Sequence, residues 1–289
     1  MSSLLQNTAE IIQSEGFTGP QSLIFLTRYA SLSEDRKLLR IIGNTLSELS
    51  TMEPTAALAY AYAEYYQASG DSMPEFCRAA ADYILTQCDE SDKMLAAAEA
   101  KCARVFGRED YLQRASELLA DHEMTAKNAA FSVLAFLEMY RATLNEKHLN
   151  TAKTMADIIE KNFPSIFNPE DVYDLAYPSM NSAIAVMYDE LARFTQEPRR
   201  VEARTRQNSF ISRLAEKYPT KVTFGLCALL ADEFEPKTIV CRYEGDELPA
   251  TLSSLLGFYS PVTEILAEQK TPAGYYFLKN GVLEQINGL

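Results

Sequence analysis

A unit of two helical segments, the first apolar and the second amphipathic, recurs five times along the first 235 residues of the chain. Within each unit a short polar turn joins the two segments. The second segments begin near five residues, with spacings of 38, 36, 37 and 52 positions between them: Leu38, Phe76, Leu112, Leu149 and Val201. A period of this size is typical of stacked helical hairpins, because one hairpin alone cannot bury its own apolar face.

The two segments of a hairpin differ in how much of their surface is apolar. Residues 57–66 and 129–142 are apolar nearly all round, which predicts helices that are buried on both sides. The segment 149–163 instead alternates apolar residues with charged ones. We therefore expect the first helices to form an inner ring and the second helices an outer layer. This arrangement is a mainly α fold, an α/α toroid of about six hairpins, with a half-hairpin at 222–230.

The pattern changes after Pro236, where β-branched residues become frequent. We expect strands over 238–243, 262–266 and 274–278, a helix over 248–258, and a hairpin turn at Asn280-Gly281. The sequence therefore predicts three parts. Residues 1–19 form a lead with a short helix, residues 20–235 form the toroid domain, and residues 236–289 form a small α/β appendage packed on it.

Two connecting segments carry local signals. Ser50 and Glu53 have the spacing of a capping box and predict that a helix begins there. The extra length between the fourth and fifth hairpins lies in residues 163–177. Long loops in compact domains are often functional, so this loop is a candidate wall of a binding site.

Composition and charge exclude several classes of function. A net charge of −13 argues against nucleic-acid binding, which requires clustered Lys and Arg. No apolar run is long enough to span a bilayer, and residues 1–19 lack the features of a secretory signal. We therefore expect a cytoplasmic protein that does not bind membranes.

The five cysteines and two histidines predict no cofactor or metal. No two cysteines form a C-x-x-C pair, which indicates buried free thiols in a reducing compartment. No metal-ligand spacing and no glycine-rich phosphate loop are present in the sequence.

Carboxylates near the starts of the inner helices are the main candidates for chemistry. Glu53, Glu99 and Asp174 have this placement, and two facing carboxylates can act as the acid and base of a glycosidase. The same residues can instead complement helix dipoles. The chain also has no Trp, which weakens the case for sugar binding. Residues 173–182 could form a pocket wall, or Pro178 to Ser182 could simply cap a helix.

The stretch Tyr177-Pro178-Ser179-Met180-Asn181-Ser182-Ala183 resembles the P-S-G-N-S motif of the YyaL-like family, also called spermatogenesis-associated, thioredoxin-fused proteins. Weaker matches precede it at Asp92-Lys93-Met94-Leu95 and at 105–115, and others follow it at 219–241 and 273–283. The resemblance covers residues 20–289. It implies an (α/α)6 toroid of the six-hairpin glycosidase type, which in the family follows a thioredoxin-like domain.

The chain departs from the family at the positions where the inner helices begin. The thioredoxin-like domain with its C-x-x-C is absent, the family's W-N pair corresponds to Ala98-Glu99, and its D-D-Y-A segment corresponds to 126–129. Ser179, Asn181 and Ser182 keep their family identity. These departures favour a non-catalytic or degenerate toroid that binds an unknown small molecule or protein partner as a binding or scaffold module.

No catalytic residue is assigned. The candidate binding residues are Glu53, Glu99, Asn128, Tyr173, Asp174, Tyr177, Ser179 and Asn181. Two alternatives stay open. One is a carbohydrate-active enzyme, a glycoside hydrolase or a sugar isomerase or epimerase, with carboxylates at the toroid centre. The other is a redox-linked role with a separate thioredoxin-like partner, since this chain has no dithiol.

Overall fold

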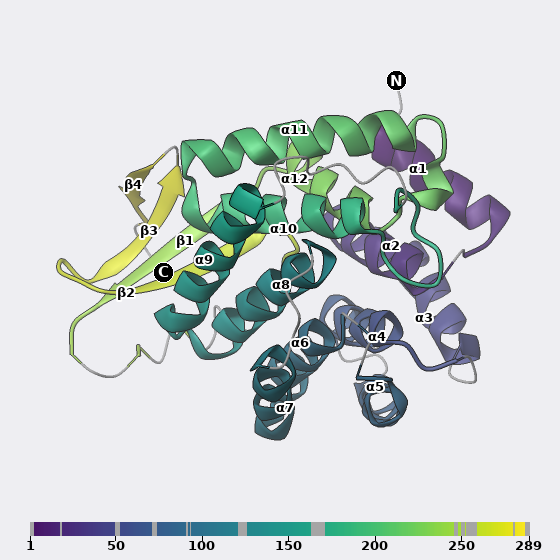
Figure 1. The fold of residues 1–289 in the computed structure, drawn as a ribbon, viewed down its shortest axis with the longest axis horizontal. Coiled ribbons are helices and arrows are strands. Elements are labelled where there is room, and N and C mark those ends of the chain that lie inside the picture. The colour runs from purple at the N-terminus through teal and green to yellow at the C-terminus, as the bar shows by residue number, and fades with distance from the viewer. Residues whose placement is uncertain are drawn as a thin grey trace.

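Helices make up most of the chain, and a small four-stranded sheet lies at its C-terminal end (Figure 1). This arrangement confirms the predicted mainly α fold with a small α/β appendage. The computed structural model describes residues 3–17, 19–49, 53–70, 74–90, 92, 94–120, 126–162, 171–245, 248–249, 252, 259–279 and 281–286.

The five predicted hairpins are all present. Their first helices are α2 (Pro20–Leu32), α4 (Ala56–Ser69), α6 (Leu95–Phe106), α8 (Ala126–Thr143) and α10 (Met180–Thr195). Their second helices are α3 (Arg36–Leu49), α5 (Pro74–Gln87), α7 (Glu109–Ala120), α9 (Glu146–Asn162) and α11 (Pro198–Ala215). The remaining helical elements are α1 (Leu4–Glu15), η1 (Pro219–Lys221), η2 (Gly225–Leu229) and α12 (Leu230–Glu233).

The first helices form a closed ring of contacts. Each of them packs against the next one in the chain, from α2 through α4, α6 and α8 to α10. The short helix η2 then contacts both α10 and α2, so the segment predicted as a half-hairpin closes the ring. Each second helix packs on its own first helix from outside. In α4 every residue from Ala56 to Tyr65 is buried, whereas α3 buries only a stripe, as the predicted inner and outer layers require.

The start of α4 corrects the capping-box prediction. Thr55 is the N-cap, and its hydroxyl accepts a hydrogen bond from the Leu58 N–H at 3.3 Å. Asp92 supports the same turn, because its carboxylate accepts a hydrogen bond from the Ala56 N–H at 3.0 Å. Glu53 precedes the helix and is exposed, and Ser50 lies outside the described residues. The predicted start was wrong because Thr55 has the extended backbone and the side-chain oxygen that an N-cap requires.

The C-terminal sheet agrees with the predicted strands. It consists of β1 (Lys237–Tyr243), β2 (Thr263–Gln269), β3 (Gly274–Lys279) and β4 (Val282–Gln285), in the order β2-β1-β3-β4. β1 and β2 are parallel, while β3 and β4 form the predicted antiparallel hairpin. Most of the helix expected over 248–258 lies outside the described residues, as does Asn280.

The sheet packs against the inner ring through β1 and β2, which both contact α10. The Thr238 hydroxyl donates to the Arg193 carbonyl at 2.9 Å, and the Ala267 N–H donates to the Tyr140 hydroxyl at 3.1 Å. The sheet therefore lies beside the last turns of α8 and α10. In the part of the chain that the structure describes, no helix combines the length and the apolar character needed to cross a membrane.

Candidate functional site

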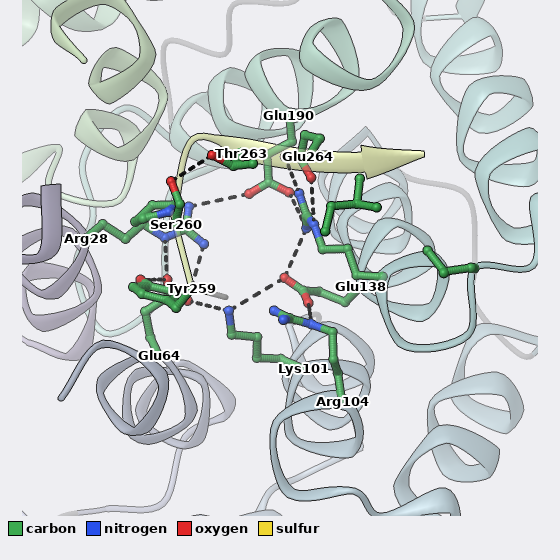
Figure 2. Close-up of a pocket in the computed structure, with 14 residues that line it drawn as sticks. Arg28, Glu64, Lys101, Arg104, Glu138, Glu190, Tyr259, Ser260, Thr263 and Glu264 are labelled. Carbon is green, nitrogen blue, oxygen red and sulfur yellow. Dashed lines mark hydrogen bonds and ion pairs between the residues drawn. The ribbon is translucent and has the colours of Figure 1, made fainter. Parts of the chain in front are cut away.

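Each inner helix places a charged side chain four or five residues before its last residue. These side chains recur at spacings of 36, 37, 37 and 52 positions, close to the hairpin period: Arg28, Glu64, Lys101, Glu138 and Glu190. All five are buried. Because the inner helices form a ring, equivalent positions on successive helices meet at its centre, and the charges face one another there (Figure 2).

Cations and carboxylates pair around this ring. Glu64 forms ion pairs with cations of the two neighbouring inner helices. Arg28 Nε lies 3.0 Å from its Oε1, and Lys101 Nζ lies 2.7 Å from its Oε2. Arg28 Nη1 lies 3.4 Å from Glu190 Oε1, which extends the ring to α10. The Tyr60 hydroxyl connects Arg28 with Glu138, because it accepts a hydrogen bond from Arg28 at 3.1 Å and donates one to Glu138 at 3.0 Å.

A second layer of polar side chains lies three residues further along four of these helices. Its members are Gln67, Arg104, Arg141 and Arg193. Arg104 Nε lies 3.0 Å from Glu138 Oε2, and Arg141 Nη1 lies 3.1 Å from Glu138 Oε1 and 3.0 Å from Glu190 Oε2. The second layer therefore supplies the positive charge that the carboxylates of the first layer need.

Two residues of the C-terminal part complete the cluster. Glu264 on β2 receives Arg141 in a bidentate contact, with Nε at 3.0 Å and Nη2 at 2.7 Å, and it also pairs with Arg193. The Tyr259 hydroxyl donates to Glu64 (Figure 2). We call the eight charged residues that line this space the central charge cluster: Arg28, Glu64, Lys101, Arg104, Glu138, Arg141, Glu190 and Glu264.

The cations of the central charge cluster lower the pKa values of Glu64, Glu138 and Glu190. Burial raises the pKa of Glu64, but Arg28 and Lys101 outweigh this effect and hold the pKa at about 2. The pKa of Glu138 is likewise held low against burial by Arg104, Lys101 and Arg141. The same balance lowers the pKa of Glu190. A general acid requires a carboxyl that is still protonated near neutral pH, and these three carboxylates do not meet that requirement.

The space inside the cluster is small. The central cavity has a volume of about 70 Å³, and its lining consists of the central charge cluster and six further residues: Leu144, Tyr259, Ser260, Pro261, Thr263 and Ile265. Typical ligand pockets have volumes of about 300 to 1,000 Å³. A cavity of this size has room for a few water molecules and not for a sugar ring.

None of the eight candidate residues from the sequence lines the central cavity. Glu99 lies on α6 but contacts the outer helix α7, where Arg114 Nη2 is 2.9 Å from its Oε1. Burial raises the pKa of Glu99 to about 7, and Arg114 only partly opposes this rise. Asn128 is buried in the first turn of α8. Both residues therefore lie away from the charged centre.

Asp174 connects the long loop to the start of η2 through hydrogen bonds. Its carboxylate accepts hydrogen bonds from the Ser179 N–H at 2.8 Å and the Phe224 N–H at 2.7 Å. Burial raises the pKa of Asp174 to about 6, although these bonds oppose the rise. Ser179 caps α10 by accepting from the Ser182 N–H at 3.1 Å, and Asn181 donates to the Asp171 carbonyl at 2.8 Å. The P-S-x-N-S segment therefore caps and anchors a helix.

The other three candidates are exposed on the outside of the ring. Partial burial and the negative charges of Asp92 and Glu53 raise the pKa of the Tyr177 hydroxyl, so both carboxylates act on this side chain electrostatically. Tyr173 stacks edge to face on Tyr218, with ring centroids 5.5 Å apart. Glu53 and Tyr177 thus interact electrostatically near the starts of α4 and α10, at a different place from the central charge cluster.

Sequence reasoning missed the central charge cluster, although a signal for it exists. Glu138 and Arg141, like Glu190 and Arg193, form an E-x-x-R pattern near the end of an otherwise apolar helix. Charged residues that recur in buried helices with the hairpin period indicate a shared centre.

The remaining candidate chemistry of the described residues is limited. No group of three or more His, Cys, Asp or Glu in the described ranges could hold a metal ion. The five cysteines are free, and four of them are buried, as predicted. The sequence matches no protein-family model and no curated protein. The resemblance to YyaL-like proteins therefore stays a prediction that depends on the quoted motifs alone.

Proposed function

We propose that the chain is a non-catalytic α/α toroid of the six-hairpin type that acts as a binding or scaffold module. The observation that carries this proposal is the central charge cluster, in which four cations face four carboxylates around a cavity of about 70 Å³. In this proposal the ring centre is a structural hub that ties five helices and the C-terminal sheet together.

The chemistry of the centre supports a structural role. Glycoside hydrolysis needs one carboxyl with a raised pKa, a second carboxylate, and room for the sugar and a water molecule. In this ring the pKa values of Glu64, Glu138 and Glu190 are lowered, and each carboxylate accepts contacts from at least two cations. Among the described residues, the ring centre therefore supplies neither the acid nor the space that a carbohydrate-active enzyme needs there.

The resemblance to YyaL-like proteins fits the same proposal. The ring of inner helices closed by η2 supports a degenerate member of that fold, and the P-S-x-N-S segment supplies its helix cap. A redox role inherited from such a family has little support, because burial raises the pKa of Cys77, Cys88 and Cys227 to about 12. Thiols with such pKa values supply almost no thiolate for exchange with a thioredoxin-like partner. Free thiols suit a reducing compartment such as the cytoplasm.

Two measurements on one pair of variants test the proposal. Glu138→Gln and Glu190→Gln are compared with wild type for turnover of a panel of aryl glycosides and for sugar isomerisation by NMR. We expect no turnover by any of the proteins. We also expect both variants to unfold at a lower temperature, because a structural carboxylate stabilises its cations. Glu202→Gln is the control, since Glu202 forms an exposed ion pair with Arg206.

An active site would give the opposite pattern. Catalytic charges commonly cost stability, so their removal stabilises an enzyme while it abolishes activity. Turnover by the wild type that is lost in Glu138→Gln, together with an unchanged or higher unfolding temperature, would therefore contradict the proposal.

A further inference from the structure

The loop before α10 presents apolar side chains to solvent. Tyr173, Leu175 and Tyr177 are 40%, 68% and 46% exposed, and Tyr218, which is 47% exposed, packs beside Tyr173. We call these four side chains the aromatic patch. They are four of the nine large apolar or aromatic side chains that are exposed in the described part of the chain. Such a concentration in one loop and the tyrosine packed beside it indicates an interaction site.

The backbone beneath the aromatic patch is held in place by buried polar contacts. Asp174 binds two N–H groups through its carboxylate, and its own N–H donates to the Lys221 carbonyl at 2.6 Å. Gln21 of α2 donates to the Ala176 carbonyl at 3.1 Å. A loop that is fixed before binding loses little conformational entropy in a complex. Rigid exposed tyrosines are also the residue type that dominates the centres of protein interfaces.

The two ends of the aromatic patch carry opposite charges. At the Tyr177 end, the exposed Glu53 acts on the tyrosine hydroxyl and helps to raise its pKa. At the Tyr218 end, Lys217 and Lys221 are exposed and outnumber Glu216. No ion pair of either lysine occurs among the described residues. A surface with one acidic and one basic end becomes complementary to itself after a two-fold rotation.

We propose that two copies of this chain associate through the aromatic patch in a two-fold symmetric dimer. The apolar middles stack on each other, and Lys217 of each copy faces Glu53 of the other. The partner is a second copy because the surface supplies both the acidic and the basic end that such a contact needs. This inference goes beyond the proposed function, because it does not depend on what the central charge cluster does.

Sedimentation velocity across a protein concentration series tests the dimer. We expect wild type to shift from monomer to dimer and Leu175→Asp to weaken the association at least about tenfold, the cost of burying a charge at the centre. Val282→Asp is the matched control, because Val282 is 61% exposed on β4 and lies outside the patch. Circular dichroism shows whether the variants are folded.

A charge exchange provides a second, independent arm. Lys217→Glu and Glu53→Lys should each weaken the dimer, and the double variant should restore it, because both cross-copy pairs are then reversed. A wild type that stays monomeric at every concentration overturns the proposal, as does a dimer that Leu175→Asp leaves intact. A third outcome also overturns the dimer proposal. If the chain stays monomeric and the aromatic patch binds a peptide selected from a displayed library, and Leu175→Asp abolishes that binding, the surface binds another protein.

Discussion

Glu264→Gln tests whether the C-terminal sheet is held to the ring by charge. The substitution keeps the shape of the side chain but removes the charge that Arg141 and Arg193 share. Glu264 is 2% exposed, so its carboxylate interacts with the two guanidinium groups away from bulk solvent. Removing one partner of a buried ion pair costs about 3 to 5 kcal/mol when the other charge is left without compensation. This range is an upper limit for Glu264→Gln, because Arg141 keeps Glu138 and Glu190 as partners and Arg193 keeps Asp189.

The size of the effect follows from the burial of the pair. At about 2 to 4 °C per kcal/mol for a large domain, the unfolding temperature of Glu264→Gln should fall by an amount that does not exceed about 20 °C. Differential scanning calorimetry and urea unfolding both measure this change. Glu268→Gln is a matched control on the same strand, since Glu268 pairs with Arg242 while both side chains remain partly exposed. The control should lose no more than about 1 kcal/mol.

The comparison between the two variants decides the outcome. If Glu264→Gln and Glu268→Gln lower the unfolding temperature equally, the central charge cluster does not hold the sheet. If Glu264→Gln is more stable than wild type, the cluster costs stability, and a functional reason for keeping it would be needed.

Three further predictions concern the helices around the ring. Burial raises the pKa of Glu99 to about 7 in the folded chain, above the value of 4.5 for an unperturbed glutamate. The ionised form of Glu99 therefore opposes folding, and this cost is fully present above about pH 7 and absent below about pH 4. Glu99→Gln should therefore be more stable than wild type to urea at about pH 8, by up to about 3 kcal/mol, and the difference should disappear by about pH 4. Gly43→Ala should lower the free energy of unfolding, measured with urea, by about 1 to 3 kcal/mol in spite of the better helix propensity of Ala, because the new Cβ would overlap the Tyr65 hydroxyl. Thr55→Ala should lower the free energy of unfolding in urea by about 1 kcal/mol, whereas Glu53→Ala should change it by less than about 0.5 kcal/mol. A larger loss in Glu53→Ala than in Thr55→Ala would restore the capping-box interpretation.

The frame of the fold was predictable because it depends on local periodicity. The segment 57–66 is apolar nearly all round and became part of the buried helix α4, since burial on two sides leaves no polar face to place. The strands 238–243 and 274–278 were recognised from β-branched residues and from the two-residue hairpin turn. These local signals do not depend on which helices pack against each other in the fold.

The central charge cluster depends on long-range geometry and was missed. Glu138 and Arg141 are separated by one helical turn, which is also the spacing of an ordinary surface pair, so only the closed ring shows that they are buried. Helix rotation explains the misplaced candidate on α6. Glu99 and Lys101 are two residues apart, and therefore about 200° apart around the helix. As a result Lys101 faces the centre while Glu99 faces α7.

The order of the chain has a consequence for synthesis on the ribosome. Residues up to Thr143 contain all four cations of the central charge cluster, namely Arg28, Lys101, Arg104 and Arg141, but only two of its four carboxylates. If the helices of a nascent chain of that length packed around the same centre, they would bury two more positive charges than negative ones. Glu190 and then Glu264 remove this excess as they emerge. The ring can therefore become neutral only when nearly the whole chain has been made, which disfavours premature closure of an incomplete product.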